Sequence, residues 1–410
     1  MKIAVIGGGA AGFFAAITCA ESNPNCRVTV FERGRAVLEK VRVSGGGRCN
    51  VSHHCFDAHT LIQHYPRGSR ELLGPFLQFG PAQTVEWFAR RGVQLKVEAD
   101  GRMFPVTDDS QTIIDCLREA ARQAKVEVRP AARVERIIPD QQGSWQLQIS
   151  GEPIATFDKL MVASGSNTAV WQILRGLGHH IVEPVPSLFT FNTKDTRLRD
   201  LAGVSVPAAQ LRIPGSKLAA AGPLLITHWG LSGPAILRLS AWGARYLYEV
   251  DYRFPLEINW LGQTLPPETS GQLQTLKITQ GKKTMAAHPV FDLPVRLWQR
   301  LLGAAGLPDT LRWAELDKGG LQQLVQQLTG ATFQIAGKST FKEEFVTAGG
   351  VQLKEINFKT FGSRLHPNLF LAGEVLDIDA ITGGFNFQAA WTGGWLAGKA
   401  MAQENGNSSV

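Results

Sequence analysis

The chain has a glycine-rich turn near its N-terminus, between a predicted strand and a predicted helix. Residues 2–6 (KIAVI) are apolar and largely β-branched, as in a buried strand, and residues 13–20 (FFAAITCA) are typical of a helix. The turn between them, residues 7–12 (GGGAAG), contains the spacing Gly-x-Gly-x-x-Gly. A second strand is predicted at 27–32 (RVTVFE), and its last residue, Glu32, follows the third glycine of that spacing by twenty positions. This order predicts an α/β fold that binds a dinucleotide.

Each glycine of the motif has a physical reason in such a fold. Gly7 allows a tight turn, Gly9 lets a pyrophosphate approach the backbone, and Gly12 lets the helix pack closely against the sheet. The N-terminus of the helix directs backbone amides toward the phosphates. The alternative is a glycine-rich turn in an ordinary βαβ unit that binds no ligand.

Glu32 and a second glycine-rich segment indicate which dinucleotide is bound. The Glu32 carboxylate is placed to accept hydrogen bonds from both ribose hydroxyls of an adenosine, which argues against a 2′-phosphate at this site. The segment 44–50 (SGGGRCN) follows soon after, and NAD does not require a second such loop. A longer cofactor needs backbone groups along its ribityl and isoalloxazine end, so the segment favours FAD, with Arg48 as a candidate partner of the pyrophosphate. A surface loop without a ligand is the alternative interpretation.

The C-terminal part of the chain resembles the second half of the same site. Residues 368–373 (NLFLAG) predict a short buried strand, after which Glu374 is placed to hold ribityl hydroxyls. The segment 383–388 (GGFNFQ) opens a predicted helix, whose N-terminus can stabilise negative charge at the flavin N1 and C2 carbonyl. A further strand at 159–165 (KLMVASG) ends in small residues that let the chain pass close to the cofactor, and Val134, in a predicted edge strand, is a candidate contact near the adenine. Taken alone, the 383–388 segment also suits a tight corner before a helix.

Seven segments in a fixed order carry a resemblance to a known family. They are GGGAAG at 7–12, FERG at 31–34, SGGGRCN at 44–50 preceded by Lys40, GRMFPVTDDS at 101–110, THWGLSGPAIL at 227–237, VTAGGV at 346–351 and AGEVLDIDAITGGFNFQAAWTGG at 372–394. Over nearly its whole length the chain resembles the HI0933-like flavoproteins, which include aminoacetone-oxidase-like enzymes and BaiN-type reductases. The resemblance implies non-covalently bound FAD in a glutathione-reductase-like Rossmann domain.

The motifs and the resemblance together predict a set of cofactor-binding positions. They are Gly7, Gly9, Ala10, Ala11, Gly12, Glu32, Arg33, Lys40, Ser44, Gly45, Gly46, Gly47, Arg48, Cys49, Asn50, Val134, Ala163, Ser164, Gly165, Gly373, Glu374, Gly384, Phe385, Asn386, Phe387 and Gln388. The chain departs from the family at 163–166, where ASGS stands in place of the common ATGG. This departure bears on the substrate more than on FAD.

The resemblance also implies an inserted region that covers the flavin and shapes the substrate site. Residues 1–189 and 344–410 are then a discontinuous FAD-binding domain, and residues 190–343 are the inserted substrate or cap domain. We expect the insertion to have a β-barrel-like part at about 190–290 and a helical part at about 291–330.

Local patterns support these two parts of the insertion. Residues 253–260 (RFPLEINW) alternate between polar and apolar side chains, which predicts a half-buried strand. Residues 262–293 are rich in Gly, Pro, Thr and Gln and are predicted to be loop. Helices are predicted at 294–302, which begins with proline, and at 320–328, where leucine and valine recur at helical spacing.

Composition bears on compartment and partners. The five cysteines are odd in number and irregularly spaced, which excludes a disulfide scaffold and favours a reduced, cytoplasmic setting. The net charge of +7 is dispersed along the sequence, so nucleic acid is not expected as a partner. Glycines break the apolar run at 3–20, so no membrane span is expected. His53, His54, His59 and His64 match no zinc spacing, and no metal is expected.

These observations predict an FAD-dependent oxidoreductase that transfers hydride between a small organic substrate and flavin N5. An amine-oxidase-like enzyme and a reductase of an activated C=C bond are both open. The reductase would take hydride from NAD(P)H that docks transiently, since FAD fills the single Gly-x-Gly-x-x-Gly unit. His228 is a candidate proton donor or acceptor. The alternatives are a flavin-containing tRNA-binding or tRNA-modifying protein and a flavin redox sensor without turnover. The sequence assigns neither the substrate nor the oligomeric state.

Overall fold

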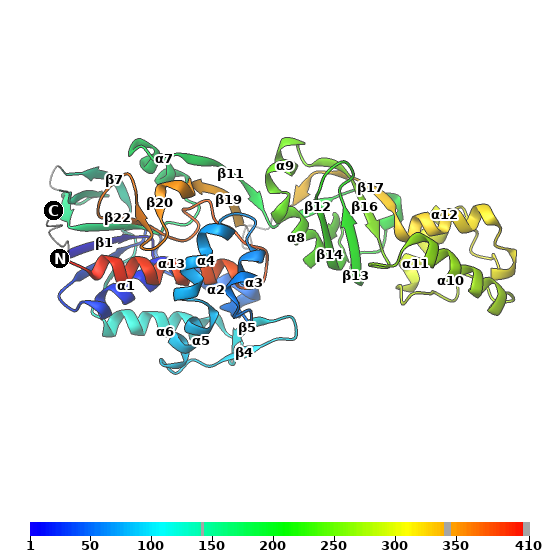
Figure 1. The fold of residues 1–410 in the computed structure, drawn as a ribbon, viewed down its shortest axis with the longest axis horizontal. Helices are drawn as coiled ribbons and strands as arrows, with labels where there is room; N and C mark the ends of the chain where they lie inside the picture. The colour runs from blue at the N-terminus through cyan, green and yellow to red at the C-terminus, as the bar shows by residue number, and fades with distance from the viewer. Residues whose placement is uncertain (141–142, 340–345, 405–410) are drawn as a thin grey trace. The chain divides into compact units, whose positions relative to one another are not determined.

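The computed structural model describes residues 1–140, 143–339 and 346–404 (Figure 1). The chain divides into two compact units. The first unit is Met1–Val185 together with Val346–Val410, and the second unit is Pro186–Phe345. The predicted domain boundary between residues 343 and 344 lies outside the described residues.

A seven-stranded sheet forms the centre of the first unit. Its strands in spatial order are β20 (Ile356–Asn357), β21 (Gly362–Ser363), β22 (Leu369–Leu371), β10 (Lys159–Val162), β1 (Lys2–Ile6), β2 (Arg27–Phe31) and β6 (Glu127–Arg129). The five strands from β22 to β6 are parallel, and the register sets Val5 between Met161 and Val30. The apolar runs of β1 and β10 are buried, as expected for central strands of a parallel sheet. This sheet confirms the predicted α/β, Rossmann-type fold.

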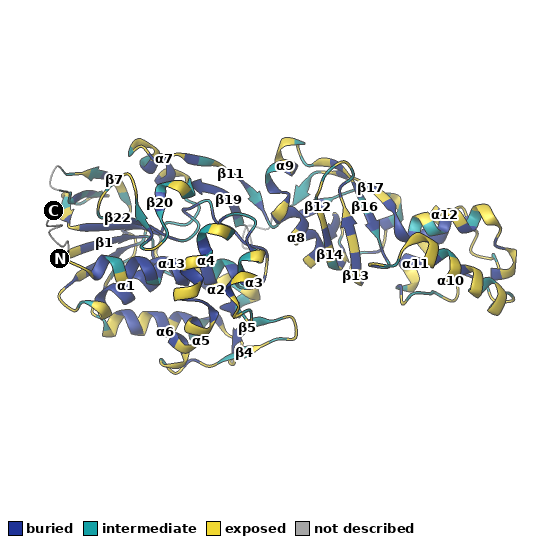
Figure 2. Ribbon diagram, in the orientation of Figure 1, coloured by how far each residue is buried: buried dark blue, intermediate teal, exposed yellow. Residues whose placement is uncertain are grey.

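The helices α1 (Ala10–Ser22) and α13 (Phe385–Ala402) pack against each other through glycines. A Cβ atom at Gly394 would lie 2.6 Å from the carbonyl oxygen of Ala11, and one at Gly398 would lie 2.6 Å from that of Ala15. Backbones approach this closely only where no side chain intervenes. Both helices consist mostly of buried residues (Figure 2). The packing therefore joins the N-terminal and C-terminal segments of the first unit.

The remaining elements of the first unit surround this core. The helices are α2 (Glu39–Val43), α3 (Ala58–Leu61), α4 (Ser69–Gln78), α5 (Pro81–Ala89), α6 (Ser110–Gln123) and α7 (Thr168–Gly176). One antiparallel sheet has the order β3 (Ser52–His53), β5 (Arg102–Pro105), β4 (Leu95–Val97). A second antiparallel sheet has the order β7 (Val134–Pro139), β8 (Trp145–Ile149), β9 (Ala155–Phe157). A further pair consists of β11 (Ile181–Ser187) and β19 (Val346–Val351). Among the described helices, none combines the length and the apolar character that a membrane span requires.

The described residues of the second unit form a seven-stranded antiparallel sheet and five α-helices. The sheet order is β17 (Ala331–Ala336), β16 (Arg253–Asn259), β13 (Ser205–Arg212), β14 (Ala219–Ile226), β15 (Gly230–Ser232), β12 (Thr190–Asn192) and β18 (Lys338–Ser339). The helices are α8 (Pro234–Trp242), α9 (Ala244–Glu249), α10 (Pro266–Thr279), α11 (Val295–Ala304) and α12 (Lys318–Thr329). Its core is buried around Trp260, Trp298 and Trp313.

The local predictions for the second unit are confirmed in part. The predicted strand at 253–260 is β16, and the predicted helices are α11 and α12. The prediction of a loop at 262–293 is wrong for residues 266–279, which form α10. Only Thr269 and Leu273 of that helix are buried, so it has no apolar stripe that periodicity could reveal.

Candidate functional site

The glycine-rich turn lies at the carboxyl end of β1, where neighbouring backbones leave no room for side chains. Gly7 has a φ of +111°, and a Cβ there would lie 2.3 Å from the carbonyl oxygen of Ala163. A Cβ at Gly12 would lie 2.0 Å from the carbonyl oxygen of Gly7. The tight turn at Gly7 and the close packing at Gly12 are therefore confirmed as properties of the fold.

Gly9 differs from these two glycines because the space in front of it is open. No heavy atom lies within 4 Å of a Cβ built at Gly9, which is the N-cap of α1 and makes no side-chain cap hydrogen bond. The positions Gly46, Gly47 and Gly165 are equally open. Open glycines at a helix N-terminus form a cradle for phosphate, because backbone amides and the helix dipole attract an anion. This arrangement fits the pyrophosphate of a dinucleotide such as FAD.

The Glu32 carboxylate is held rigidly just beyond the end of β2. Its Oε2 accepts a hydrogen bond from the backbone N–H of Gly8 (2.8 Å), and its Oε1 accepts one from Gly34 (2.7 Å). Each oxygen keeps a second lone pair, which is enough to accept a ribose hydroxyl as well. Arg33 is exposed at the same turn, and Val134 begins β7, the edge strand predicted near the adenine.

The second glycine-rich segment forms a left-handed turn. Gly45, Gly46 and Gly47 have φ values of +59°, +69° and +85°, a run of conformations that residues other than glycine rarely adopt. The backbone N–H of Cys49 donates to the carbonyl oxygen of Ser44 (3.0 Å) and closes the turn. Burial raises the pKa of the Cys49 thiol to about 12, so Cys49 fills a tight loop as a neutral side chain.

Side chains lock this turn to the start of α13. The amide oxygen of Asn50 accepts a hydrogen bond from the backbone N–H of Gly384 (2.9 Å), and the amide nitrogen of Asn50 donates one to the carbonyl oxygen of Ser52 (3.0 Å). The hydroxyl of Ser52 donates to Oε1 of Gln388 (2.6 Å), and the Gln388 amide donates to Thr392 (3.1 Å) within the buried core. Two segments that the sequence separates by more than three hundred residues thus form one rigid wall.

The first turn of α13 is shaped by its own side chains. Both backbone polar groups of Ala380 bond to the amide of Asn386, which closes the loop before the helix. The ring of Phe387 stacks on that of Trp391 at 5.5 Å. Gly384, at φ +87°, is the N-cap of the helix, and stabilisation of the flavin carbonyl by this N-terminus stays a prediction.

Two of the clustered histidines pack as aromatic rings. The ring of Phe385 lies 4.7 Å from that of His53 and 4.2 Å from that of His64. His53 Nε2 lies 3.0 Å from the carbonyl oxygen of Asp100, and burial lowers the pKa of His53. In the part of the chain that the structure describes, no group of three or more His, Cys, Asp or Glu residues is arranged to hold a metal ion.

Two basic side chains that are predicted to bind the cofactor form ion pairs within the protein. Lys40 forms an ion pair with Glu374, which brings together predicted cofactor-binding residues from opposite ends of the chain. The Arg48 guanidinium pairs with Glu98 (2.6 Å) and lies 4.0 Å from the centre of the Phe104 ring. The predicted contact of Arg48 with pyrophosphate therefore competes with an ion pair already present.

The end of β10 carries a buried hydroxyl without a partner. Ser164 Oγ is inaccessible to solvent and makes no hydrogen bond in the described structure. The Cα of Ser164 would lie 3.0 Å from a Cβ built at Gly7, so this residue is next to the glycine turn. Gly373, at φ +80°, lies at the end of β22, where its Cβ would be 3.2 Å from that of Ala11. An unsatisfied polar atom next to the glycine turn is a second feature that fits a polar ligand there.

The remaining candidate, His228, belongs to the second unit. It is exposed in the connection between β14 and β15. Its role as a proton donor or acceptor stays a prediction.

One ion pair at this end of the first unit has no sequence signal. Arg67 pairs with Asp379, whose side chain is fully buried, through two hydrogen bonds. It joins the turn before α4 to the loop that precedes α13. The partners are 312 positions apart, and although Asp379 lies within the family segment 372–394, nothing in the sequence indicates that it pairs with Arg67.

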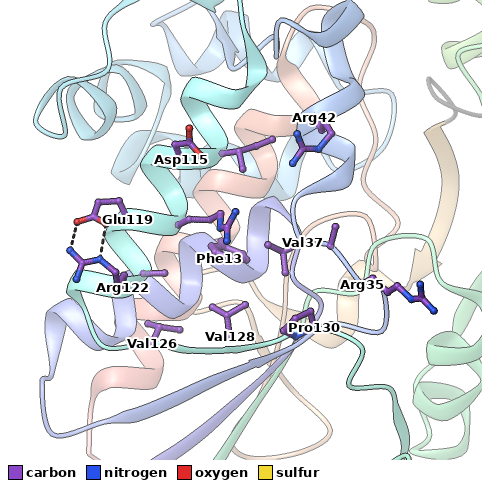
Figure 3. A pocket seen from close by; sticks show the side chains of 14 residues that line it. Phe13, Arg35, Val37, Arg42, Asp115, Glu119, Arg122, Val126, Val128 and Pro130 are labelled. Carbon is purple, nitrogen blue, oxygen red and sulfur yellow. Dashed lines mark hydrogen bonds and ion pairs between the residues drawn. The ribbon is translucent and has the colours of Figure 1, made fainter.

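The first unit contains a cavity of about 760 Å³ (Figure 3). Its walls come from α1, α6, β6 and the segment after β2, and Arg122 on its rim pairs with Glu119. The described residues that line it are Phe13, Arg35, Ala36, Val37, Arg42, Ile114, Asp115, Arg118, Glu119, Ala121, Arg122, Val126, Val128 and Pro130. None of these is a predicted cofactor-binding position, but the cavity adjoins the glycine turn, since a Cβ at Gly8 would lie 2.9 Å from the Val37 side chain.

Comparison with known proteins places this geometry in a family. The model of the HI0933-like protein Rossmann domain matches residues 1–400. The chain is 28% identical to a 3-dehydro-bile acid delta(4,6)-reductase from Clostridium scindens, covering 98% of this chain and 99% of that protein. It is 27% identical to a ribosomal RNA dihydrouridine synthase from Escherichia coli, covering 97% of each.

A solved structure shows the same fold. The 3-ketosteroid-Δ4-(5α)-dehydrogenase from Rhodococcus jostii RHA1, in complex with 4-androstene-3,17-dione, aligns with a TM-score of 0.53 at 14% identity. The alignment covers 98% of this chain and 97% of that structure. At this identity the likeness supports the fold alone.

Proposed function

The chain belongs to the HI0933-like family and is an FAD-dependent oxidoreductase, and from this premise we propose that it reduces a carbon–carbon double bond conjugated to a carbonyl group. Hydride adds to the β-carbon of the substrate and a proton to the α-carbon. The C=C π bond breaks and two C–H bonds form. The cofactor, when bound in its reduced form, would supply the two electrons, and NAD(P)H would be its reductant.

The names of two relatives carry this proposal, because they describe one type of chemistry. A 3-dehydro-bile acid with double bonds at positions 4 and 6 is a conjugated ketone. Dihydrouridine arises when the C5=C6 bond of uracil, conjugated to the C4 carbonyl, is reduced. Both relatives align with this chain over nearly its full length, so the reaction they share is a better guide than either substrate. Neither name describes amine oxidation, and we do not propose it.

The residues of the first unit have defined tasks in this proposal. The amides at the N-terminus of α1, with Gly9 open in front of them, bind the pyrophosphate, and Glu32 binds the adenosine ribose. Glu374, oriented by Lys40, holds ribityl hydroxyls. The N-terminus of α13 stabilises negative charge at the pyrimidine end of the flavin. When bound in its reduced form, FAD supplies the hydride.

An anaerobic single-turnover experiment tests the proposal. The purified holoprotein is mixed with NADH or NADPH in a stopped-flow instrument, and loss of the visible flavin band is followed. The reduced protein is then mixed without oxygen with a 4-ene-3-keto steroid, with a uridine-containing RNA, or with the saturated analogue of each. Return of the flavin band with an unsaturated compound alone, together with a product heavier by two hydrogens, is the expected result. Reoxidation by oxygen only would contradict the proposal.

A further inference from the structure

We propose that Arg67 and Asp379 are positioning residues for the flavin. Their buried ion pair fixes the loop 377–384 (DIDAITGG) and, through this loop, the N-terminus of α13, so that the protein binds reduced FAD more tightly than oxidised FAD. The inference rests on the assignment of this N-terminus to the pyrimidine end of the flavin, which is part of the proposed function.

The ion pair is shielded from water and has a defined geometry. The side chain of Asp379 is fully buried, and that of Arg67 is 13% exposed. The Arg67 guanidinium donates from Nε to Oδ1 and from Nη2 to Oδ2 of Asp379, and the backbones of the two residues form a β-bridge. A bidentate pair of this kind fixes the orientation of its partners as well as their distance. The pair therefore holds the middle of the loop in one orientation.

The segment that contains Arg67, residues 64–68 (HYPRG), makes further contacts along the loop and the helix. The carbonyl oxygen of His64 accepts a hydrogen bond from the backbone N–H of Ile381 (3.0 Å). The buried hydroxyl of Tyr65 donates to the carbonyl oxygen of Phe385 (2.6 Å), the first residue of α13. The ring of His64 stacks on the ring of Phe385 at 4.2 Å. One short segment therefore holds both the loop and the first turn of the helix.

The end of the loop needs this support because two consecutive glycines form it. Gly383 and Gly384 have φ values of +137° and +87°. A Cβ at Gly384 would lie 2.4 Å from the carbonyl oxygen of Ser52, so β3 packs directly against this turn. Glycine has more accessible backbone conformations than any other residue, and the contacts with β3 and with residues 64–68 select one of them. Tertiary contacts therefore set the direction of the helix N-terminus.

This direction matters for the relative affinity of the two states of the flavin. Negative charge develops at the pyrimidine end of the ring on reduction, and a fixed helix N-terminus stabilises that charge only while it is aligned and close. The ratio of the affinities for reduced and oxidised FAD sets the reduction potential of the bound cofactor. A residue that only supports the fold weakens both affinities alike and leaves the potential unchanged. The potential therefore distinguishes positioning from general support.

Reduction potentials of the variant holoproteins, with the dissociation constant of oxidised FAD for each, test the inference. Arg67→Lys keeps the positive charge next to Asp379 but cannot form the bidentate pair. Tyr65→Phe removes only the hydroxyl that reaches Phe385. In each variant we expect the preference for reduced FAD to fall by roughly threefold to tenfold, because one hydrogen bond that orients the helix is lost. For a two-electron couple this corresponds to a potential lower by about 15–30 mV.

The matched control makes the same exchange in another ion pair of the first unit. Arg91 pairs with Glu21, which lies in the last turn of α1, at the end of that helix remote from the glycine turn. We expect Arg91→Lys to leave the potential unchanged. Circular dichroism and the flavin content of each purified protein show that the variants are folded and loaded.

The outcomes separate this inference from the proposed function. A lower potential in Arg67→Lys and in Tyr65→Phe, but not in Arg91→Lys, supports the inference. Weaker binding of oxidised FAD at an unchanged potential would overturn it, and so would an equal shift in the control or no change at all. A wild-type protein that reduces a conjugated double bond while neither variant shifts the potential keeps the proposed function and loses this inference. The expected shifts in a protein that reduces no such bond keep the inference and lose the proposed function.

Discussion

At the scale of single residues, three glycines of one motif have different tasks, and mutation should separate them. A Cβ at position 9 meets no heavy atom within 4 Å, so we expect the Gly9→Val protein to fold and its side chain to occupy the space of the pyrophosphate. Loss of hydrogen bonds to a charged group costs about 1.5–3 kcal/mol, so FAD affinity should fall at least about tenfold. Gly12→Val should not fold, because its Cβ would lie 2.0 Å from a backbone oxygen.

Circular dichroism and the flavin content of the purified proteins check this pair of variants. A folded Gly9→Val protein that retains all of its flavin would contradict the position assigned to the phosphates. A folded Gly12→Val protein would contradict the packing of α1 on the turn.

His179 provides a prediction about pH. Its side chain is buried, with Nδ1 at 2.8 Å from Glu355 and Nε2 at 3.2 Å from Ser363, and the ring of His366 is 6.0 Å away. Burial lowers the pKa of His179, and the hydrogen bond to Glu355 only partly opposes this effect. Because the folded pKa is below the unfolded one, the neutral ring stabilises the fold fully above the unfolded pKa. That stability is lost as the pH falls through the unfolded pKa toward the folded one.

Urea unfolding of the wild type and of His179→Gln measures this effect. At neutral pH the variant should be about 1–3 kcal/mol less stable, since it loses buried hydrogen bonds. This difference in unfolding free energy should shrink between about pH 7 and pH 5. The wild type loses stability there because His179 takes up a proton in the unfolded state, and the variant has no such group. A difference that grows on acidification would show instead that a charged His179 pairs with Glu355.

At the scale of elements, the approach of α1 to α13 determines how the two halves of the cofactor site meet. Gly398→Leu places a side chain where a Cβ alone would be 2.6 Å from the Ala15 oxygen, and we expect a loss of about 2–3 kcal/mol. Gly271→Ala, in α10, is the matched control, because its Cβ meets nothing within 4 Å. Removing a glycine from an exposed helix interior should stabilise by about 0.5–1 kcal/mol. Thermal unfolding of both variants would reveal opposite shifts, and destabilisation by both would indicate that α10 is not helical in solution.

Elements were predictable where one local signal was sufficient. The strand β1 is a short apolar run that Gly7 ends, and β22 (Leu369–Leu371) is one that Gly373 and Glu374 soon follow. Both strands are buried on both faces of the sheet, so their apolar sequences alone predict a strand. Helix α10 has the opposite character, with Leu265 before it and Ile278 within it largely exposed. Its polar composition resembles that of a loop, and its helical state depends on packing that a single sequence does not show.

At the scale of the whole molecule, the site depends on contacts that join distant parts of the sequence. The residues proposed to bind the phosphates follow from spacing alone, but the pairing of Lys40 with Glu374 and of Arg67 with Asp379 does not. Charge shows the same limit. Basic residues look dispersed along the sequence, and the excess on the second unit becomes visible only once the bounds of that unit are known. The sequence-based expectation that nucleic acid is no partner rested on this dispersion, and it stays a prediction.

These contacts between distant parts of the sequence lead to a prediction about cofactor binding. A ligand that binds only the folded state stabilises whatever it holds together, by about 2.7 kcal/mol at a free concentration one hundred times its Kd. FAD that contacts both glycine turns and the N-termini of α1 and α13 should therefore slow hydrogen exchange in both helices together, although about 360 residues separate them. Hydrogen-exchange mass spectrometry with and without FAD measures this effect, and β13 and β14 of the second unit provide the reference. Protection of α1 without α13 would mean that the C-terminal segment is no part of the site. Equal protection of both helices in Glu374→Ala would mean that the ion pair with Lys40 does not hold the two halves together, and that the glycine contacts between the helices are sufficient.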